Sequence, residues 1–356
     1  MNAYTQFNRS RTSVVADVGR HTIRVGLTDE DGHLDHATVR EYDPAAQSTI
    51  STALSAYAVD AGLPSLPRRA AIAVSGVPRG DIISVTKSRW ILSRSGLTAM
   101  FQAAPLILND FAANAWAMSD PACSGRVEPM STHAVRLHQP GTYCIIGIGS
   151  GLGVAIMSRD EYGLVSVLPT EAGHMGLMDG VVGGHPVIAR LRNGDGPLSA
   201  ETLFSARGLL AVYRAMCDLR GRPALRNGMS ELLSHASLRA DPVLVETFDF
   251  FARAFWQFAG NLALAYGAWD GVILTGSITA ALRQVLRRPE LSRHFVVDGP
   301  YSRRLAQIPR ATMSFRHAEL EGAAVALLIE DQRRAAVAGV GIAANQISAP
   351  CTLSAC

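Results

Sequence analysis

Two parts of the chain share one pattern of short apolar runs. Each part contains three β-rich runs joined by tight turns, at residues 13–19, 22–29 and 33–42 in the first part and at residues 143–148, 152–158 and 163–168 in the second. Runs of this length, bounded by turn residues, are typical of antiparallel strands. Helical stretches follow both sets and can cover the apolar faces of the strands. The repeat therefore predicts two related α/β domains with mixed sheets and a cleft between them.

The hydrophobic pattern then alternates between helix and strand. The first part continues with helix 51–61, strands 69–77 and 81–92, helix 97–104, strand 105–108 and helix 111–118. The second part continues with helices 201–219, 240–268 and 278–287 and with a strand at 271–275. Residues 119–141 are polar, contain three prolines and are predicted to join the two parts. We expect a small domain at 12–118 completed by a helix at 318–337, a large domain at 119–317 and a frayed tail at 338–356.

Composition excludes several classes of protein. The chain has 356 residues, 48% of them hydrophobic, which is enough for two buried cores. Its net charge of +3, from 33 basic and 30 acidic residues, is too balanced to favour nucleic acid or an anionic membrane as a partner. The five cysteines are scattered without a C-x-x-C spacing, so the sequence predicts neither a zinc site nor a disulfide framework.

Two segments of the sequence are informative about cellular localisation. Residues 1–11 are polar and lack the apolar core of a signal peptide. Residues 243–268 are apolar but carry Glu246, Asp249 and Arg253 at helical spacing. That spacing indicates a buried amphipathic helix instead of a membrane span. We therefore expect a cytoplasmic protein with no membrane partner.

Residues 147–153 form a glycine-rich loop between two predicted strands. Ser150 lies at its centre, and glycine occupies four of the seven positions, namely Gly147, Gly149, Gly151 and Gly153. Without Cβ atoms, the backbone N–H groups of such a loop can approach an anion closely. The loop is not a P-loop, because no Lys-Ser/Thr pair follows, and not a dinucleotide motif, because a strand follows instead of a helix. A phosphate-binding hairpin and an ordinary glycine-rich turn both remain open.

The first predicted hairpin offers a second place for phosphate. Asp17 and Gly19 end its first strand. An aspartate at this position can hold a magnesium-bound water, while the N–H groups of the turn face phosphate. An ordinary hairpin with a turn aspartate is the alternative interpretation.

Asn109 and Asp110 follow a short apolar strand. The carboxyl ends of such strands border ligand crevices in α/β sheets. Asp110 could accept a hydroxyl proton, and Asn109 could both donate to and accept from sugar hydroxyls. The alternative is that the pair caps the helix predicted at 111–118, and the two roles are compatible.

Four further residues are candidates for binding a polyol and a nucleotide. Glu171 and His174 flank Gly173 in a loop after a predicted strand, where they could supply acceptors and donors to hydroxyls. A surface loop with a capping glutamate is the alternative. Glu201 opens a helix, where an acidic residue commonly complements the helix dipole. Gly276 lies between a strand and a helix, where a base or ribose could bind, or where the chain simply turns.

Taken in order, these motifs resemble the bacterial glucokinase family, which has the actin-like ATPase fold of sugar kinases and Hsp70-type proteins. The similarity extends from about Val14 to Leu327 and rests on six segments: LILNDFAANAWAM, GIGSGLGVAIM, PTEAGHMG, SAETLFSARGLLAVYRAM, FAGNLALAYGAWDGVILTGSI and ELEGAAVAL. Several spaced matches in the right order are more specific than any one of them. The resemblance implies two actin-like (ribonuclease H-like) α/β domains.

The resemblance also implies an activity and a role for each motif. The activity is transfer of the γ-phosphoryl group of ATP, with Mg²⁺, to the 6-hydroxyl of glucose. Asp110 corresponds to the general base. The residues implied to bind the sugar are Asn109, Glu171, His174 and Glu201. Those implied on the nucleotide side are Asp17, Gly19, Arg20, Gly147, Gly149, Ser150, Gly151 and Gly276, and no side chain is assigned as a direct metal ligand.

The first phosphate loop departs from the family pattern. Arg20 stands where the family has a glycine, and His21 and Thr22 replace its Thr and Asn. Arg20 could obstruct phosphate or add a direct contact to it. A degenerate homologue that binds sugar as a sensor therefore stays as an alternative, and a kinase for another hexose is a second one. ROK-type sugar kinases fit less well because their cysteine-rich zinc motif is absent, and a homodimer is the oligomeric state expected from base rates.

Overall fold

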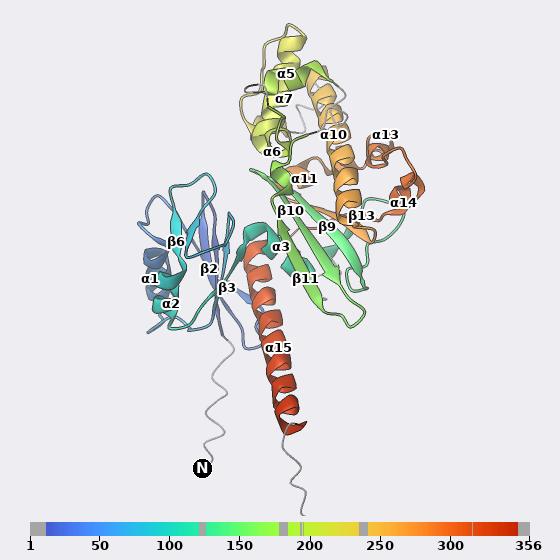
Figure 1. Cartoon of the computed structure of the whole chain (residues 1–356). Helices are drawn as coiled ribbons and strands as arrows, with labels where there is room; N and C mark the ends of the chain where they lie inside the picture. The colour runs from blue at the N-terminus through green and yellow to red at the C-terminus, as the bar shows by residue number, and fades with distance from the viewer. Residues whose placement is uncertain are drawn as a thin grey trace, which may run out of the picture. The chain divides into compact units, whose positions relative to one another are not determined.

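The computed structural model describes residues 12–120, 126–177, 184–192, 194, 196–234, 241–314 and 316–347, with side chains up to residue 334. The chain divides into two compact units (Figure 1). The first unit contains Met1–Ala117 together with Glu319–Cys356, and the second contains Met118–Ala318. Each unit has its own mixed sheet and its own core.

The first unit is built on a five-stranded sheet. Its elements are β1 (Val14–Val18), β2 (Ile23–Thr28), β3 (Leu34–Tyr42), α1 (Ile50–Asp60), β4 (Ala70–Val74), β5 (Ile82–Ser84), β6 (Ile91–Ser93), α2 (Arg94–Phe101), β7 (Leu106–Asn109), α3 (Asp110–Met118) and α15 (Ala318–Ile347). The strand order is β3-β2-β1-β4-β7. The first three strands are antiparallel neighbours, and β4 and β7 are parallel to β1.

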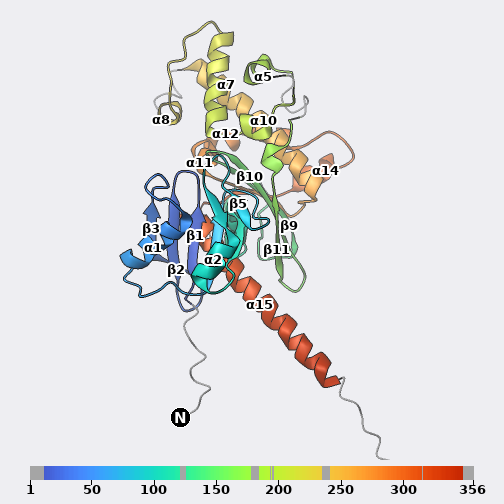
Figure 2. The ribbon, with the colours of Figure 1, turned by 60° about the vertical axis from the view of Figure 1, so that its left-hand side comes forward.

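The two faces of this sheet are covered by different helices, because side chains of a strand alternate between faces. Val14, Ala16 and Val18 belong to a core cluster that contains residues of α1 and α2. Val15 belongs to a second cluster with Ala113 of α3 and apolar residues of α15. Figures 1 and 2 show α1 and α2 together on one side of the strands and α15 on the other. By the same alternation, Asp17 points to the face that α3 and α15 cover.

The second unit repeats this plan in a larger form. Its elements are β8 (Glu128–Pro129), β9 (Gly141–Ile148), β10 (Leu152–Arg159), β11 (Val165–Thr170), the 3-10 helix η3 (Ala172–His174), α5 (Pro186–Leu191), α6 (Ala200–Leu203), α7 (Ala206–Leu219), α8 (Met229–Leu232), α10 (Pro242–Tyr266), β12 (Gly271–Thr275), α11 (Ser277–Ala281), α12 (Arg283–Leu286), α13 (Pro289–Ser292), the 3-10 helix η4 (Arg293–Phe295), α14 (Ser302–Gln307) and β13 (Arg310–Thr312). The strand order is β11-β10-β9-β12-β13-β8. Three antiparallel strands followed by two parallel ones therefore occur in both units. This confirms the predicted pair of α/β domains with mixed sheets.

The helix α10 explains the long apolar segment of the sequence. Asp241 caps it by accepting a hydrogen bond from the Val243 N–H, and Pro242 occupies its first turn. Gly267 ends it in the left-handed conformation, at φ 62°. Most of its apolar side chains are buried in the core of the second unit. In the described part of the chain, no helix is both long and apolar enough to cross a membrane.

Several predicted elements differ from the observed ones. Residues 81–92 were predicted as one strand but form the hairpin β5–β6, a separate two-stranded sheet. Residues 201–219 contain two helices, α6 and α7, because Ser205 caps a new helix by accepting from the Gly208 N–H. Residues 278–287 are likewise divided between α11 and α12. The helix α15 extends ten residues beyond the predicted bound of 337, into the segment predicted as a tail, while residues 348–356 lie outside the described residues.

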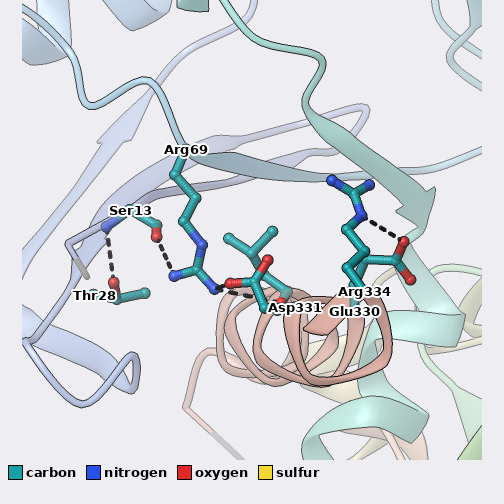
Figure 3. A network of polar contacts seen from close by, with 7 residues as sticks. Ser13, Thr28, Arg69, Glu330, Asp331 and Arg334 are labelled. Atoms are coloured by element: carbon teal, nitrogen blue, oxygen red, sulfur yellow. Dashed lines mark hydrogen bonds and ion pairs between the residues drawn. The ribbon is translucent and has the colours of Figure 1, made fainter. Parts of the chain in front are cut away.

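A polar network attaches α15 to the first sheet (Figure 3). The Arg69 guanidinium donates to Ser13 Oγ at 2.8 Å, to the Leu327 carbonyl at 3.4 Å and to the Asp331 carboxylate. Ser13 in turn donates its N–H to Thr28 Oγ1 at 2.9 Å. Arg69 thus links the beginning of β4 to the beginning of β1 and to α15. The network fixes a helix that is far away in sequence against the sheet.

Candidate functional site

Asn109 and Asp110 lie where β7 ends and α3 begins. The Asn109 side chain is buried and uses both ends of its amide: Oδ1 accepts from the Ala112 N–H at 2.9 Å, and Nδ2 donates to the Gly76 carbonyl at 3.1 Å. Asn109 therefore caps α3, as the alternative interpretation predicted. Asp110 Oδ1 accepts from the Phe111 N–H at 2.8 Å, which orients the carboxylate at the carboxyl end of the strand.

Asp17 is a buried carboxylate of the first unit. It is 5% exposed, and its Oδ2 lies 3.1 Å from Nη1 of Arg24 on the neighbouring strand. Burial raises the pKa of the Asp17 carboxyl well above its usual range. The nearby carboxylates of Glu319 and Asp110 raise it further, and Arg24 lowers it. Three carboxylates and one guanidinium therefore share this side of the sheet, with an excess of negative charge.

The hairpin between β1 and β2 is a tight turn. The Gly19 N–H donates to the Thr22 carbonyl at 3.1 Å, which closes the turn around Arg20 and His21. The Arg20 guanidinium donates from Nε to His21 Nε2 at 2.9 Å. Arg20 is half-buried and His21 is exposed. The arginine that replaces the family glycine is therefore held along the turn by its own neighbour.

In the second unit, residues 147–153 form the tip of the β9–β10 hairpin, with the turn at residues 149–151. Gly147 pairs with Gly153 across the hairpin, and the Gly149 N–H donates to the Gly151 carbonyl at 3.0 Å. Ser150 is exposed at the tip. A Cβ at Gly149 would meet only the Ser277 hydroxyl, at 3.8 Å. The loop is thus open at Gly149, where a phosphate group could approach the backbone.

Gly276 connects β12 to α11 beside this loop. Its φ is 94°, a conformation that favours glycine. A Cβ at this position would lie 2.4 Å from the Ile148 carbonyl oxygen, on the neighbouring strand β9. Gly276 is required here by close backbone packing against the glycine loop.

Glu201 lies in the first turn of α6 and contacts the same loop. Its Oε2 accepts from the Leu152 N–H at 3.3 Å. A Cβ at Gly151 would be only 2.6 Å from Oε2. The missing side chain of Gly151 therefore gives the Glu201 carboxylate its place, which links the predicted phosphate loop directly to a predicted sugar ligand.

Glu171 and His174 are both exposed; Glu171 precedes the short helix η3, and His174 is its last residue. Their side chains form an ion pair at 3.8 Å when the imidazole is protonated. Gly173 lies between them, and a Cβ there would be 2.0 Å from the Leu152 carbonyl. The Glu171–His174 loop therefore packs on the beginning of β10, next to the N–H that Glu201 binds.

The structure gathers the predicted residues into two groups. One group lies in the first unit: Asp17, Gly19, Arg20, Asn109 and Asp110. The other lies in the second unit: Gly147, Gly149, Ser150, Gly151, Glu171, His174, Glu201 and Gly276. Sequence reasoning missed Arg24, Asn114 and Glu319, which surround Asp17 and Asp110. The spacing of Asn114, four residues after Asp110 on a predicted helix, was the one available signal.

Comparison with known proteins identifies the family. The family model described as glucokinase matches residues 14–329. The chain belongs to the glucokinase family. It is therefore related to ATP-dependent hexose kinases over nearly its whole length.

Individual members of the glucokinase family agree with this. The glucokinase of Stenotrophomonas maltophilia (strain R551-3) is 32% identical over 320 residues, covering 88% of this chain and 94% of the relative. A crystal structure of glucokinase from an Antarctic psychrotroph has a TM-score of 0.73 and 25% identity, covering 90% of this chain and 99% of that one. The glucokinase of Balamuthia mandrillaris, solved in complex with glucose, has a TM-score of 0.71 at 19% identity, covering 92% and 95%, and supports the fold.

Proposed function

We propose that this protein transfers the γ-phosphoryl group of ATP to the 6-hydroxyl of glucose, forming glucose 6-phosphate. Membership of the glucokinase family carries this proposal. The Asp110 carboxylate at the end of β7, held by the Phe111 N–H, supports it, since the reaction needs a base at a fixed position.

Asp110 would accept the proton of the attacking hydroxyl. Its neighbour Asn109 already uses one amide proton and one oxygen lone pair to hold α3 and Gly76. An amide has a second proton and a second lone pair, so Asn109 could also contact the sugar. The helix cap and the sugar contact are thus compatible.

The remaining sugar ligands would be Glu171, His174 and Glu201. Glu201 binds the Leu152 N–H, and the loop that carries Glu171 and His174 packs through Gly173 against the Leu152 carbonyl. Two carboxylates and an imidazole can together hold several hydroxyls of a sugar. Because each hydrogen bond to a charged group contributes about 1.5–3 kcal/mol, the set would select a polyol.

ATP would bind at the turn around Ser150 and at the turn around Arg20, instead of through the N–H groups of Gly149 and Gly19, since these already donate within those turns. Ser150 is exposed between two glycines, which fits this role, and Gly276 would lie on the nucleotide side beside the same turn. Mg²⁺ bound to the phosphates would supply positive charge against the charge that develops during transfer. Asp17 would hold a water of that ion, where the excess of carboxylates already favours a cation.

The test is production of glucose 6-phosphate from glucose and magnesium-ATP by the purified protein, compared with Asp110→Asn. The variant should bind glucose as well as the starting protein does, but its turnover should fall by about 100-fold or more, the range for loss of a positioned base. Near-normal turnover by Asp110→Asn would contradict the role of Asp110. Turnover with mannose or an amino sugar but not with glucose would instead support the other hexose kinases.

A sugar sensor without turnover is the second candidate. The Arg20 side chain favours it, because it occupies the turn where the family pattern has a glycine. Glucose binding by calorimetry without any binding of magnesium-ATP would support the sensor.

We further propose that the protein works in the cytoplasm, where ATP is supplied. We also propose that it is a homodimer, which light scattering would test.

A further inference from the structure

Asn114 connects the catalytic end of α3 to α15. It is 7% exposed and lies one helical turn after Asp110. Its Nδ2 donates to the Asp110 carbonyl at 3.1 Å and to Oε1 of Glu319 at 3.3 Å. A helical asparagine can donate to the carbonyl four residues before it, so the first bond is a local one. The second acceptor comes from a residue 205 positions away in the sequence, so the second bond is a tertiary contact.

The contact with Glu319 is fixed by close packing of the two helices. Gly322, one turn after Glu319, lies so near α3 that a Cβ there would be 1.7 Å from the Ala113 carbonyl oxygen. Ala113 and Leu320 belong to one buried cluster. Side chains at this crossing have little freedom to move apart, so Glu319 is held beside Asn114 by the backbones themselves.

Glu319 also faces the other charged groups of this side of the sheet. Its carboxylate acts electrostatically on Asp17 and on Arg24, and Asp110 acts on the same Asp17. The nearby positive charge comes from Arg24, which is shared with Glu41 and Asp17. Glu319 therefore has two possible actions: it accepts a hydrogen bond from Asn114, and it adds a negative charge.

We propose that Glu319 is a positioning residue for the transfer reaction, which fixes the Asp110 peptide and carboxylate through the hydrogen bonds of Asn114. This inference rests on the proposed function, in which Asp110 is the base. The action is through the hydrogen bond: the acceptor oxygen of Glu319 orients the Asn114 amide, and that amide holds the Asp110 carbonyl. Glu319 itself touches neither the sugar nor the nucleotide in this role.

Four variants test the proposal. Glu319→Ala and Asn114→Ala should each lower kcat by about 10- to 100-fold and leave the KM for glucose nearly unchanged, because a displacement of about 1 Å in a reacting group can cost 100-fold. Glu319→Gln keeps an acceptor oxygen and should keep most of the rate. The matched control is Glu321→Ala, since Glu321 also lies in the first turn of α15 but contacts His36 at 3.3 Å. It should behave as the starting protein does.

A second readout does not depend on activity. The Phe111 N–H bonds the Asp110 carboxylate at 2.8 Å, so its proton chemical shift reports the position of that carboxylate. Glu319→Ala should move this resonance, and Glu319→Gln should not. If the starting protein makes no glucose 6-phosphate, the proposed function fails, while the Phe111 shift still decides the positioning role. A Glu319→Ala variant with unchanged kcat or an unchanged Phe111 shift, or a Gln variant as slow as the Ala variant, would overturn the inference.

Discussion

The Gly151→Ala substitution distinguishes two roles for the glycine loop: binding phosphate alone, and also holding the Glu201 carboxylate in position. If the loop only binds phosphate, the added methyl group should weaken ATP binding. The structure instead places the new Cβ 2.6 Å from Oε2 of Glu201, well inside the distance that real Cβ contacts show. The backbone of Gly151 can accept alanine, because its φ is not among the positive values. The strain must therefore be relieved by the far end of the Glu201 side chain.

The size of the effect follows from that displacement. The bond from the Leu152 N–H to Oε2 is already long at 3.3 Å, so a shift of a few tenths of an ångström breaks it. Rotation of the Glu201 carboxylate away from Leu152 should change the free energy of unfolding little. It would, however, remove the carboxylate from the position in which it could accept a hydrogen bond from a sugar hydroxyl. Loss of one charge-assisted hydrogen bond costs about 1.5–3 kcal/mol, which is about a 10- to 150-fold rise in the KM for glucose.

The assay is coupled detection of glucose 6-phosphate with glucose and ATP varied separately. The matched control is Gly149→Ala, where the new Cβ would meet only the Ser277 hydroxyl, at 3.8 Å. We expect Gly151→Ala to raise the KM for glucose and Gly149→Ala to affect ATP instead, with Tm nearly unchanged in both. An unchanged KM for glucose in Gly151→Ala would refute the link between this loop and Glu201.

Three further predictions concern stability and the first hairpin. Gly276→Ala should lower the free energy of unfolding by at least about 1–3 kcal/mol in urea titration, because φ is 94° and the Cβ would contact the Ile148 backbone; an unchanged midpoint would contradict this packing. Burial raises the pKa of Asp17, so the folded protein binds that proton more tightly than the unfolded chain and stability falls as pH rises above the ordinary value of 3.8. Asp17→Asn should therefore raise the urea midpoint at pH 7, with a gain that shrinks as the pH is lowered toward about 4; a midpoint that falls at pH 7 would show that the Arg24 ion pair outweighs burial. Arg20→Gly should weaken binding of magnesium-ATP by about 1.5–3 kcal/mol in calorimetry with glucose present if Arg20 contacts phosphate, whereas binding that appears only in the variant would favour the sensor.

The sequence alone determined most of the local structure and the family. Short β-rich runs bounded by turns predicted β1 and β9 within their hairpins, and β12 was predicted with its observed bounds. These features are local: they depend on the spacing of apolar residues and on turn chemistry within a few positions. The Asn109 cap was also predictable, because a cap acts on an N–H only three residues away.

Only the tertiary structure decided which charged groups meet. Asp17 gains Glu319 as a neighbour because odd-numbered residues of β1 face α15, and Gly322 lets α15 approach α3 closely enough for Glu319 to reach Asn114. From the sequence, Glu201 is predicted only to complement the helix dipole at the start of a helix. Its hydrogen bond to the Leu152 N–H depends on how α6 packs against β10. Nothing in local spacing encodes contacts between residues dozens to hundreds of positions apart. They arise from helix packing on a sheet, which fixes side chains only once the whole unit has folded.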